Sequence, residues 1–179
     1  MSKSIKTRAR TCDVAYGFRM STGFAGDVNR TQPASIEPNM NDATNPVNLF
    51  GNAVLVNGSA NTVRKVLATD TGVTAIYGIA VRPYPTQQAS GGASAAFGVG
   101  GPAANQPVDV LRQGYFMTKV VGSPVKDGTV YLWVAADSGA HVQGGFEASS
   151  SASTVTLTNV FFNGPAGADG VAELYIRTR

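Results

Sequence analysis

The chain has 179 residues, which is enough for one domain with a sizeable buried core and too few for a second full domain. Charged side chains make up only 14% of the sequence, against roughly 25% in a typical soluble domain, and the net charge is +3. So small a positive excess does not by itself predict nucleic-acid binding. The composition instead favours a surface that contacts other proteins.

The first 46 residues are predicted to form an extended N-terminal arm, because they are rich in Gly, Pro and Asn and keep no period of 3.6 or 2. Basic residues are concentrated in the first thirty positions, where only Asp13 and Asp27 oppose them. This pattern indicates an acidic partner surface, and isolated aromatic residues are the expected anchors. The candidate protein-interface residues are Lys3, Lys6, Arg8, Arg10, Tyr16, Phe18, Phe24 and Arg30.

Residues 47–179 are predicted to form an all-β body, a single antiparallel β-barrel or β-sandwich, because short β-branched and aromatic runs alternate with Gly, Asn, Asp and Pro. No window of eleven residues keeps an apolar stripe free of Gly or Pro, so no long helix is expected. A bulge is expected near Asn159. The expected strands are Leu49–Val56, Thr62–Ala68, Ala75–Arg82, Val108–Leu111, Tyr115–Val121, Thr129–Ala135, Thr154–Phe162 and Val171–Arg177.

A Gly/Ala-rich loop is expected at about 86–107. Loops of this length in a compact domain are usually functional or disordered. Its glycine-rich stretch 98–102 is followed neither by Lys-Ser/Thr nor by a helix, so phosphate binding is not predicted there.

The sequence predicts synthesis in a reducing cytoplasm. Cys12 is the only cysteine, which excludes an intramolecular disulfide framework. The N-terminus lacks the apolar run of about 7 to 15 residues that a signal peptide needs, and no later stretch approaches the roughly 20 apolar residues of a membrane span.

The sequence offers little chemistry for catalysis. His141 is the only histidine, and it lies in a turn-forming segment where a solvent-facing role is the simpler interpretation. Cys12 lies in the arm, away from any element that would activate a nucleophile. One histidine and one cysteine exclude an ordinary zinc site, and Asp169 lacks the further carboxylates of a calcium loop. No catalytic residue, cofactor site or metal site is therefore predicted.

An aromatic sugar-binding platform is the main alternative, because Tyr84, Tyr115, Tyr131 and Trp133 could stack on a ligand. Trp133 lies inside an expected strand, however, and a tryptophan there more often belongs to a core or an interface. These aromatics also lack the interleaved Lys and Arg that single-stranded nucleic acids require. A carbohydrate-binding virion or adhesin module is the alternative function, and a small hydrolase ranks third.

A series of short turn-and-strand segments carries a family resemblance. The segments are GFAGDVNR (23–30), FGNAV (50–54), YGIAVRPYP (77–85), VLRQGYFMTKV (110–120), KDGTVY (126–131), GGFEA (144–148) and DGVAEL (169–174). In their order, and over most of the chain, they resemble the structural cement proteins that decorate the heads of tailed bacteriophages. The Gly/Ala insertion at 89–105 and the basic first ten residues depart from that pattern. The resemblance implies a β-barrel-like body, capsid binding and no catalysis, and it identifies no contact residues.

Together, this resemblance and the lack of a reactive centre predict a virion structural protein that binds the outside of a capsid and bridges major capsid subunits. The predicted partners are the major capsid protein and further copies of the chain, as a dimer or trimer, because exposed strand edges on a weakly charged surface need to be covered. No membrane, specific nucleic acid or cofactor is expected as a partner. The predicted location is the capsid surface of a virion made in the host cytoplasm.

Overall fold

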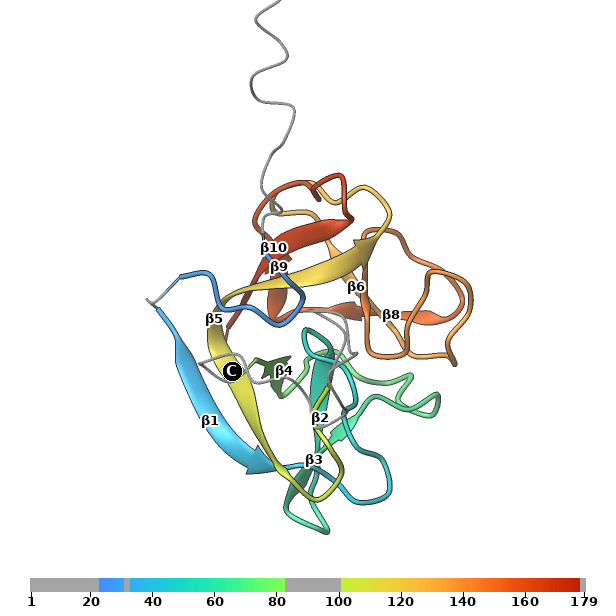
Figure 1. Cartoon of the computed structure of the whole chain (residues 1–179). Coiled ribbons are helices and arrows are strands. Elements are labelled where there is room, and N and C mark those ends of the chain that lie inside the picture. The colour runs from blue at the N-terminus through green and yellow to red at the C-terminus, as the bar shows by residue number, and fades with distance from the viewer. Residues whose placement is uncertain (1–22, 31–32, 83–100, 178–179) are drawn as a thin grey trace, which may run out of the picture.

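The computed structural model describes residues 23–30, 33–82 and 101–177, and this part of the chain contains strands and no helix (Figure 1). The prediction of an all-β fold is confirmed. The described residues accordingly provide no long apolar helix of the kind that crosses a membrane. The strands are β1 (Ser35–Met40), β2 (Ala53–Asn57), β3 (Thr62–Lys65), β4 (Gly78–Val81), β5 (Pro107–Val121), β6 (Val130–Trp133), β7 (Phe146–Glu147), β8 (Thr154–Leu157), β9 (Val160–Phe162) and β10 (Val171–Ile176).

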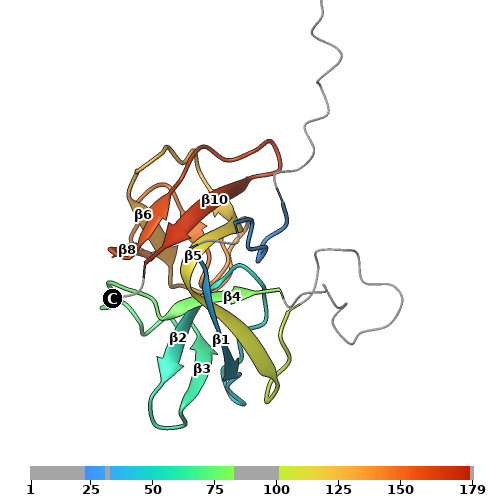
Figure 2. The same cartoon turned by 90° about the vertical axis from the view of Figure 1, so that its left-hand side faces the viewer.

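The ten strands join in one large mixed sheet whose strand order does not close into a barrel. Strand β5, 15 residues long, organises this sheet because its two halves pair with different neighbours. Its first half pairs antiparallel with both β1 and β4, and its second half pairs antiparallel with β10 and, at its end, parallel with β7. Two views at right angles show β5 running from the β1–β4 group to the β6–β10 group (Figure 1 and Figure 2).

Gly114 lies where the two halves of β5 meet. Its φ is +140°, a backbone conformation that residues with side chains rarely adopt, and a Cβ there would lie 2.7 Å from the carbonyl oxygen of Pro33. The sequence predicts two strands, Val108–Leu111 and Tyr115–Val121, because a glycine within a strand pattern often marks a break. That prediction is wrong: one strand continues through the glycine.

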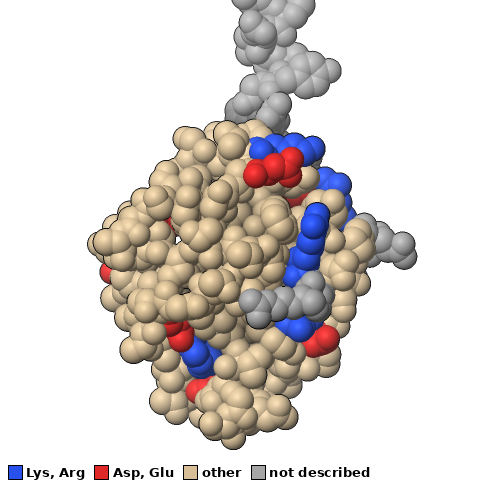
Figure 3. All heavy atoms as spheres, turned by 180° about the vertical axis from the view of Figure 1, so that it is seen from behind, with Lys and Arg blue, Asp and Glu red and all other residues tan. Residues whose placement is uncertain are grey.

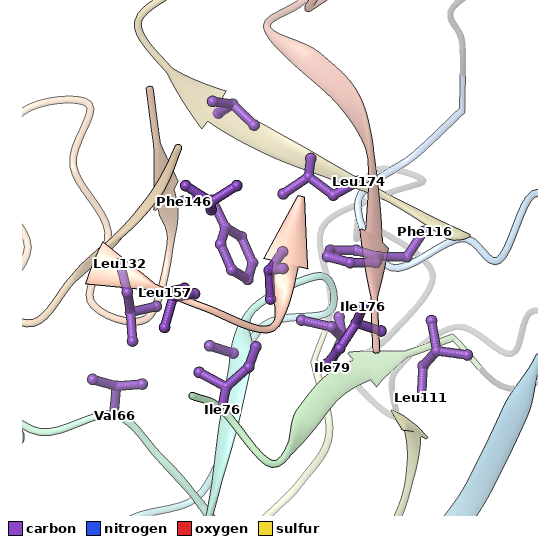
Figure 4. Close-up of a cluster of buried hydrophobic side chains, with 14 of the residues drawn as sticks. Val66, Ile76, Ile79, Leu111, Phe116, Leu132, Phe146, Leu157, Leu174 and Ile176 are labelled. Carbon is purple, nitrogen blue, oxygen red and sulfur yellow. The ribbon is translucent and has the colours of Figure 1, made fainter. Parts of the chain in front are cut away.

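The main hydrophobic core lies between the two groups of strands. Phe116 and Phe146 are at its centre, each no more than 1% exposed, with their ring centroids 5.8 Å apart. Figure 4 shows Ile79 of β4 and Leu111 of the first half of β5 beside Ile176 of β10 and Phe116 of the second half of β5. One core is therefore shared by both groups.

A smaller apolar cluster covers the opposite face of β2, β4 and the first half of β5. Along β2, Val54 packs into this smaller cluster, whereas Ala53 and Leu55 belong to the main core. This alternation is what a strand with both faces buried produces. The cluster consists of Val47, Val54, Val63, Ala80, Val108 and Val110.

Asp42 ties the chain that precedes β2 to the β2–β3 hairpin. Its carboxylate accepts hydrogen bonds from the backbone N–H groups of Asn45 and Thr44, both 2.8 Å, and from the side chains of Asn57 (2.7 Å) and Thr62 (2.9 Å). These donors, led by the Asn45 N–H, hold the pKa of Asp42 well below its ordinary value. The carboxylate is therefore a structural acceptor.

Residues 33–46, which the sequence places in the arm, contribute a strand to the sheet. Strand β1 runs antiparallel along β5, from Ser35 opposite Gln113 to Met40 opposite Pro107. Its composition hides it, because Glu, Pro and Asn are depleted in strands and most of its side chains are exposed. Residues 1–22 lie outside the described residues, so an extended arm over them stays a prediction.

The expected strand Thr154–Phe162 divides into β8 and β9. The interruption has a local cause, because Thr158 and Asn159 bond to a loop instead of a strand. The Thr158 N–H donates to Thr74 O (2.9 Å), and the Asn159 side chain bonds both backbone groups of Ile76, at 3.2 and 2.9 Å. Of the expected loop at 86–107, residues 86–100 lie outside the described residues.

Candidate functional site

The turn formed by residues 23–27, here called the Phe24 turn, is fixed firmly to the sheet. The Phe24 N–H donates to the Asp27 carboxylate (2.8 Å), and the Gly26 N–H donates to Met117 O on β5 (2.8 Å). Gly26 has a φ of +89°, and a Cβ there would lie 2.5 Å from Cβ of Phe50. The Phe24 side chain is nevertheless 48% exposed. The turn thus holds a large apolar ring in solvent on a rigid support.

Arg30, the second predicted site residue in the described chain, is bound to the body. Its guanidinium donates to both carboxylate oxygens of Glu173, at 2.9 and 2.8 Å, and lies 4.1 Å over the ring centroid of Tyr115. Glu173 also accepts hydrogen bonds from the side chains of Asn29 and Asn163. Arg30 and the Phe24 turn therefore both rest on the second half of β5, but the charge of Arg30 is already neutralised.

The other predicted site residues lie outside the described residues, so their part in an interface stays a prediction. They are Lys3, Lys6, Arg8, Arg10, Tyr16 and Phe18.

Glu173 gives the stability a dependence on pH. Burial alone would raise the pKa of this carboxyl, but hydrogen bonds from Arg30, Asn163 and Asn29 outweigh burial and hold the pKa below its ordinary 4.5. Because the folded-state pKa is lowered, the ionised carboxylate stabilises the fold above pH 4.5, and this contribution is lost as the pH falls through the folded-state pKa. We expect Glu173→Gln to be less stable than the wild type at neutral pH, with the difference shrinking below pH 4.5.

Urea unfolding of both proteins, from neutral pH down to about pH 3, measures this difference. Asp127→Asn is the matched control, because Asp127 is an exposed turn residue with a φ of +59°, a conformation that asparagine also adopts. A deficit of Glu173→Gln that stays constant with pH would contradict the assignment.

The outer face of β5, β10 and β9 carries a row of aromatic rings between two arginines, here called the aromatic row. Tyr115, Tyr175 and Phe161 stand opposite one another in the sheet register, and the rings of the two tyrosines lie 4.7 Å apart. Arg30 covers Tyr115, and Arg177 lies 4.9 Å from the ring centroid of Phe161. Tyrosine, phenylalanine and arginine are the types enriched in protein interfaces.

A pocket opens beside Arg177, with a volume of about 260 Å³. Leu55 and Ile76 form buried apolar parts of its wall, at 7% and 4% exposure, and Val56, 44% exposed, also lines it. Arg112 and Arg177 also line it. The pocket therefore combines apolar side chains with two cationic residues.

Trp133 and Tyr115, two of the four aromatic residues considered for a sugar platform, contact different partners. Trp133 is 9% exposed and stacks on His141, with ring centroids 4.3 Å apart, whereas Tyr115 belongs to the aromatic row. His141 is not a free turn residue, because its Nδ1 lies 2.5 Å from the buried carboxylate of Glu147. Tyr84 lies outside the described residues. Within the described ranges, no group of three or more His, Cys, Asp and Glu side chains is arranged to hold a metal ion.

Most of the surface is uncharged. Figure 3 shows the charged side chains of one face in a band near its margin and in a small group near its lower edge, with a broad uncharged area between them. Such a surface suits close contact with another protein, because few charges must be desolvated.

Comparison with known families decides the class of the protein. Residues 13–177 match the family described as structural cement protein (E217 gp24/Pam3 gp6). The chain belongs to this family. Among solved structures, the cement protein is similar to a chain of the capsid of Myoviridae phage XM1, with a TM-score of 0.63 and 19% identity over 89% of this chain and 92% of that chain. No curated protein matches the sequence.

The family match confirms the resemblance inferred from the sequence and the general function, a structural component that stabilises a phage capsid. Sequence reasoning missed Phe161, Tyr175 and Arg177 of this cement protein as surface features. A signal was present, because alternation along β10 places Glu173 and Tyr175 on the face opposite Leu174 and the core. That alternation does not show which rings in the neighbouring strands meet them.

Proposed function

We propose that this cement protein decorates the outside of a phage head and stabilises it by bridging major capsid subunits. The family match over residues 13–177 is the observation that carries the proposal. A fold shared with a chain from the capsid of Myoviridae phage XM1 supports it. The protein acts by contact and not by catalysis. It is made in the host cytoplasm and joins the virion at the capsid surface.

The proposed mechanism is preferential binding to the assembled shell. A protein that binds adjacent subunits in their assembled geometry, and binds free subunits weakly, stabilises the shell by mass action. Once one subunit is bound, contact with the second is effectively intramolecular. An interface of roughly 1,600 Å² is sufficient for such a contact, and a few anchoring side chains supply most of its energy. Phe24 is the proposed anchor in the described chain, and the basic residues of the arm are proposed to meet an acidic capsid surface.

Self-association is the second part of the proposal. Strand β1 carries Pro38 and strand β3 carries Arg64 and Lys65, which are residues that discourage pairing at a sheet edge. Strand β8, Thr154–Leu157, lies at the end of the strand order and contains neither charge nor proline. We propose that β8 is covered in a dimer or trimer. Native mass measurement of the free protein and of the protein released from heads tests this, and a monomer in both would refute it.

The deciding experiment mixes the purified protein with phage heads that lack it and images the heads by electron cryomicroscopy. We expect ordered density at symmetry-related positions on the outer surface and a higher temperature of head disruption. Heads that stay bare at saturating protein would overturn the proposed function.

Phe24→Ala tests the anchor in the same assay, with Val125→Ala as its matched control because Val125 is also an exposed apolar side chain, 64% exposed. We expect Phe24→Ala to bind heads about 10-fold or more weakly, since truncation of an anchoring aromatic costs about 2 kcal/mol or more. Val125→Ala should bind like the wild type. Equal binding by both variants would remove Phe24 from the interface.

A further inference from the structure

Arg177 differs from the other arginines of the described chain in its partners. Within the described residues it has no carboxylate within ion-pair distance, and its guanidinium lies over the rings of Phe161 and Tyr175, at 4.9 and 5.7 Å. A guanidinium stacked on a ring is oriented but keeps its N–H donors available. Each of the remaining arginines in this part of the chain has a carboxylate oxygen within 3.7 Å: Arg30, Arg64, Arg82 and Arg112.

Arg112, on the same pocket, is held by other groups. Its guanidinium carbon lies 3.5 Å from the ring centroid of Tyr77, it donates to the Tyr77 carbonyl oxygen, and its Nε lies 3.5 Å from the Glu37 carboxylate. The Tyr77 hydroxyl in turn donates to Glu37, at 3.0 Å. Glu37 thus offsets the charge of Arg112, whereas no carboxylate of the described residues offsets the charge of Arg177.

The size and lining of the pocket indicate what it accepts. Its volume of about 260 Å³ is below the roughly 300 to 1,000 Å³ typical of small-molecule sites, and it suits one side chain. Leu55, Val56 and Ile76 give it an apolar wall, and Arg177 is a cationic residue of its lining. An apolar side chain next to a carboxylate on an extended segment matches both properties.

We propose that the Arg177 pocket is a docking site for an acidic segment of the major capsid protein. A carboxylate of that segment receives the two-pronged hydrogen bond of the Arg177 guanidinium, and a neighbouring apolar side chain enters the pocket against Leu55 and Ile76. Charge complementarity selects this occupant over a basic or uncharged segment. The inference rests on the proposed function and names the partner chemistry for a second contact, apart from Phe24.

The test measures binding of wild type, Arg177→Gln, Arg177→Glu and Lys126→Glu to heads that lack the cement protein. Lys126→Glu is the matched control, because it makes the same change of charge as Arg177→Glu at an exposed turn residue. We expect Arg177→Gln to bind about 10-fold more weakly and Arg177→Glu about 100-fold more weakly, since breaking a desolvated charge pair at an interface acts mainly on dissociation. Lys126→Glu should bind within about 2-fold of the wild type.

Two further readouts separate docking from a structural role. The thermal midpoints of the free variants should equal that of the wild type, because Arg177 is exposed. Raising the salt concentration should weaken wild-type binding more steeply than Arg177→Gln binding, because the variant has lost one ion pair. Equal affinity of both Arg177 variants and the wild type, or an equal loss in Lys126→Glu, would overturn the proposal.

The occupant is identified by photo-crosslinking from Val56→p-benzoylphenylalanine on coated heads. The proposal requires a peptide of the major capsid protein that contains Asp or Glu next to an apolar residue. A crosslink to a second cement protein, or to nucleic acid, would refute it. A wild type that leaves heads bare would instead refute the proposed function itself, so the two failures are distinguishable.

Discussion

Replacement of Phe146 by alanine is expected to lower the free energy of unfolding by about 3 to 5 kcal/mol, the usual range for a buried phenylalanine. Phe146 lies on the two-residue strand β7, is 1% exposed and packs against Phe116. The cavity would open where the two groups of strands meet, and β7 is too short to shift and fill it. Because domains have a total stability of about 5 to 15 kcal/mol, this loss would remove a large fraction of the total.

Urea unfolding followed by tryptophan fluorescence measures this loss, because Trp133 lies on β6, which pairs directly with β7. Phe24→Ala is the matched control, since it removes the same ring from a site that is 48% exposed. We expect Phe24→Ala to change the free energy of unfolding by less than about 1 kcal/mol. If Phe146→Ala were no more destabilising than Phe24→Ala, the shared core would not be what holds the two groups together.

Asn41→Ala is expected to lower the free energy of unfolding by about 2 to 4 kcal/mol, an unusual loss for an asparagine. Asn41 is fully buried. Its side-chain nitrogen donates to Val47 O (2.9 Å) and Ala103 O (3.0 Å), and its side-chain oxygen accepts from the Val47 N–H (2.9 Å). Alanine would leave the N–H and the carbonyl of the buried Val47 without these partners, and each unsatisfied buried group costs about 1 to 3 kcal/mol.

Asn39→Ala provides the comparison, because Asn39 lies two residues earlier and its side chain bonds to Glu37 O, at 3.2 Å, in an exposed position. Chemical denaturation of both variants under the same conditions gives the two losses. We expect Asn39→Ala to stay within about 0.5 kcal/mol of the wild type. Similar losses for the two would show that the buried network around Asn41 is not what attaches the chain before β2.

Some strands of the fold could be predicted from the sequence, and others could not. Runs such as Ala53–Asn57 and Val171–Ile176 were predictable because apolar residues recur with the strand period or run continuously where both faces are buried. Strand β1 was not, because Glu37, Pro38 and Asn39 disfavour strands and only the partner β5 makes this segment extended. Asn41 bonds to Val47, six residues away, and to Ala103, 62 residues away, and the second contact cannot be predicted from the local sequence.

The candidate surface was predictable to a smaller extent. Phe24 could be selected because an isolated aromatic residue among glycines has no strand of its own in which to be buried. Arg30 could be selected for its charge, but its neutralisation by Glu173, 143 residues away, follows from tertiary structure. Arg177 could not be selected from the sequence, because it resembles any other basic residue near a terminus. Its distinction is the missing carboxylate partner in the described chain, and only the fold reveals it.

The continuous strand β5 determines how the protein carries mechanical load. Its backbone joins the β1–β4 group to the β6–β10 group without interruption, so a force that pulls the groups apart is borne by covalent bonds. The neighbours β1 and β10 lie lengthwise along β5. Under a force along β5, these strands can separate from it only by sliding in shear, which breaks many hydrogen bonds at the same time. A force in this direction cannot break the hydrogen bonds one after another. The protein is therefore expected to resist extension along β5 more strongly than separation of its strands sideways.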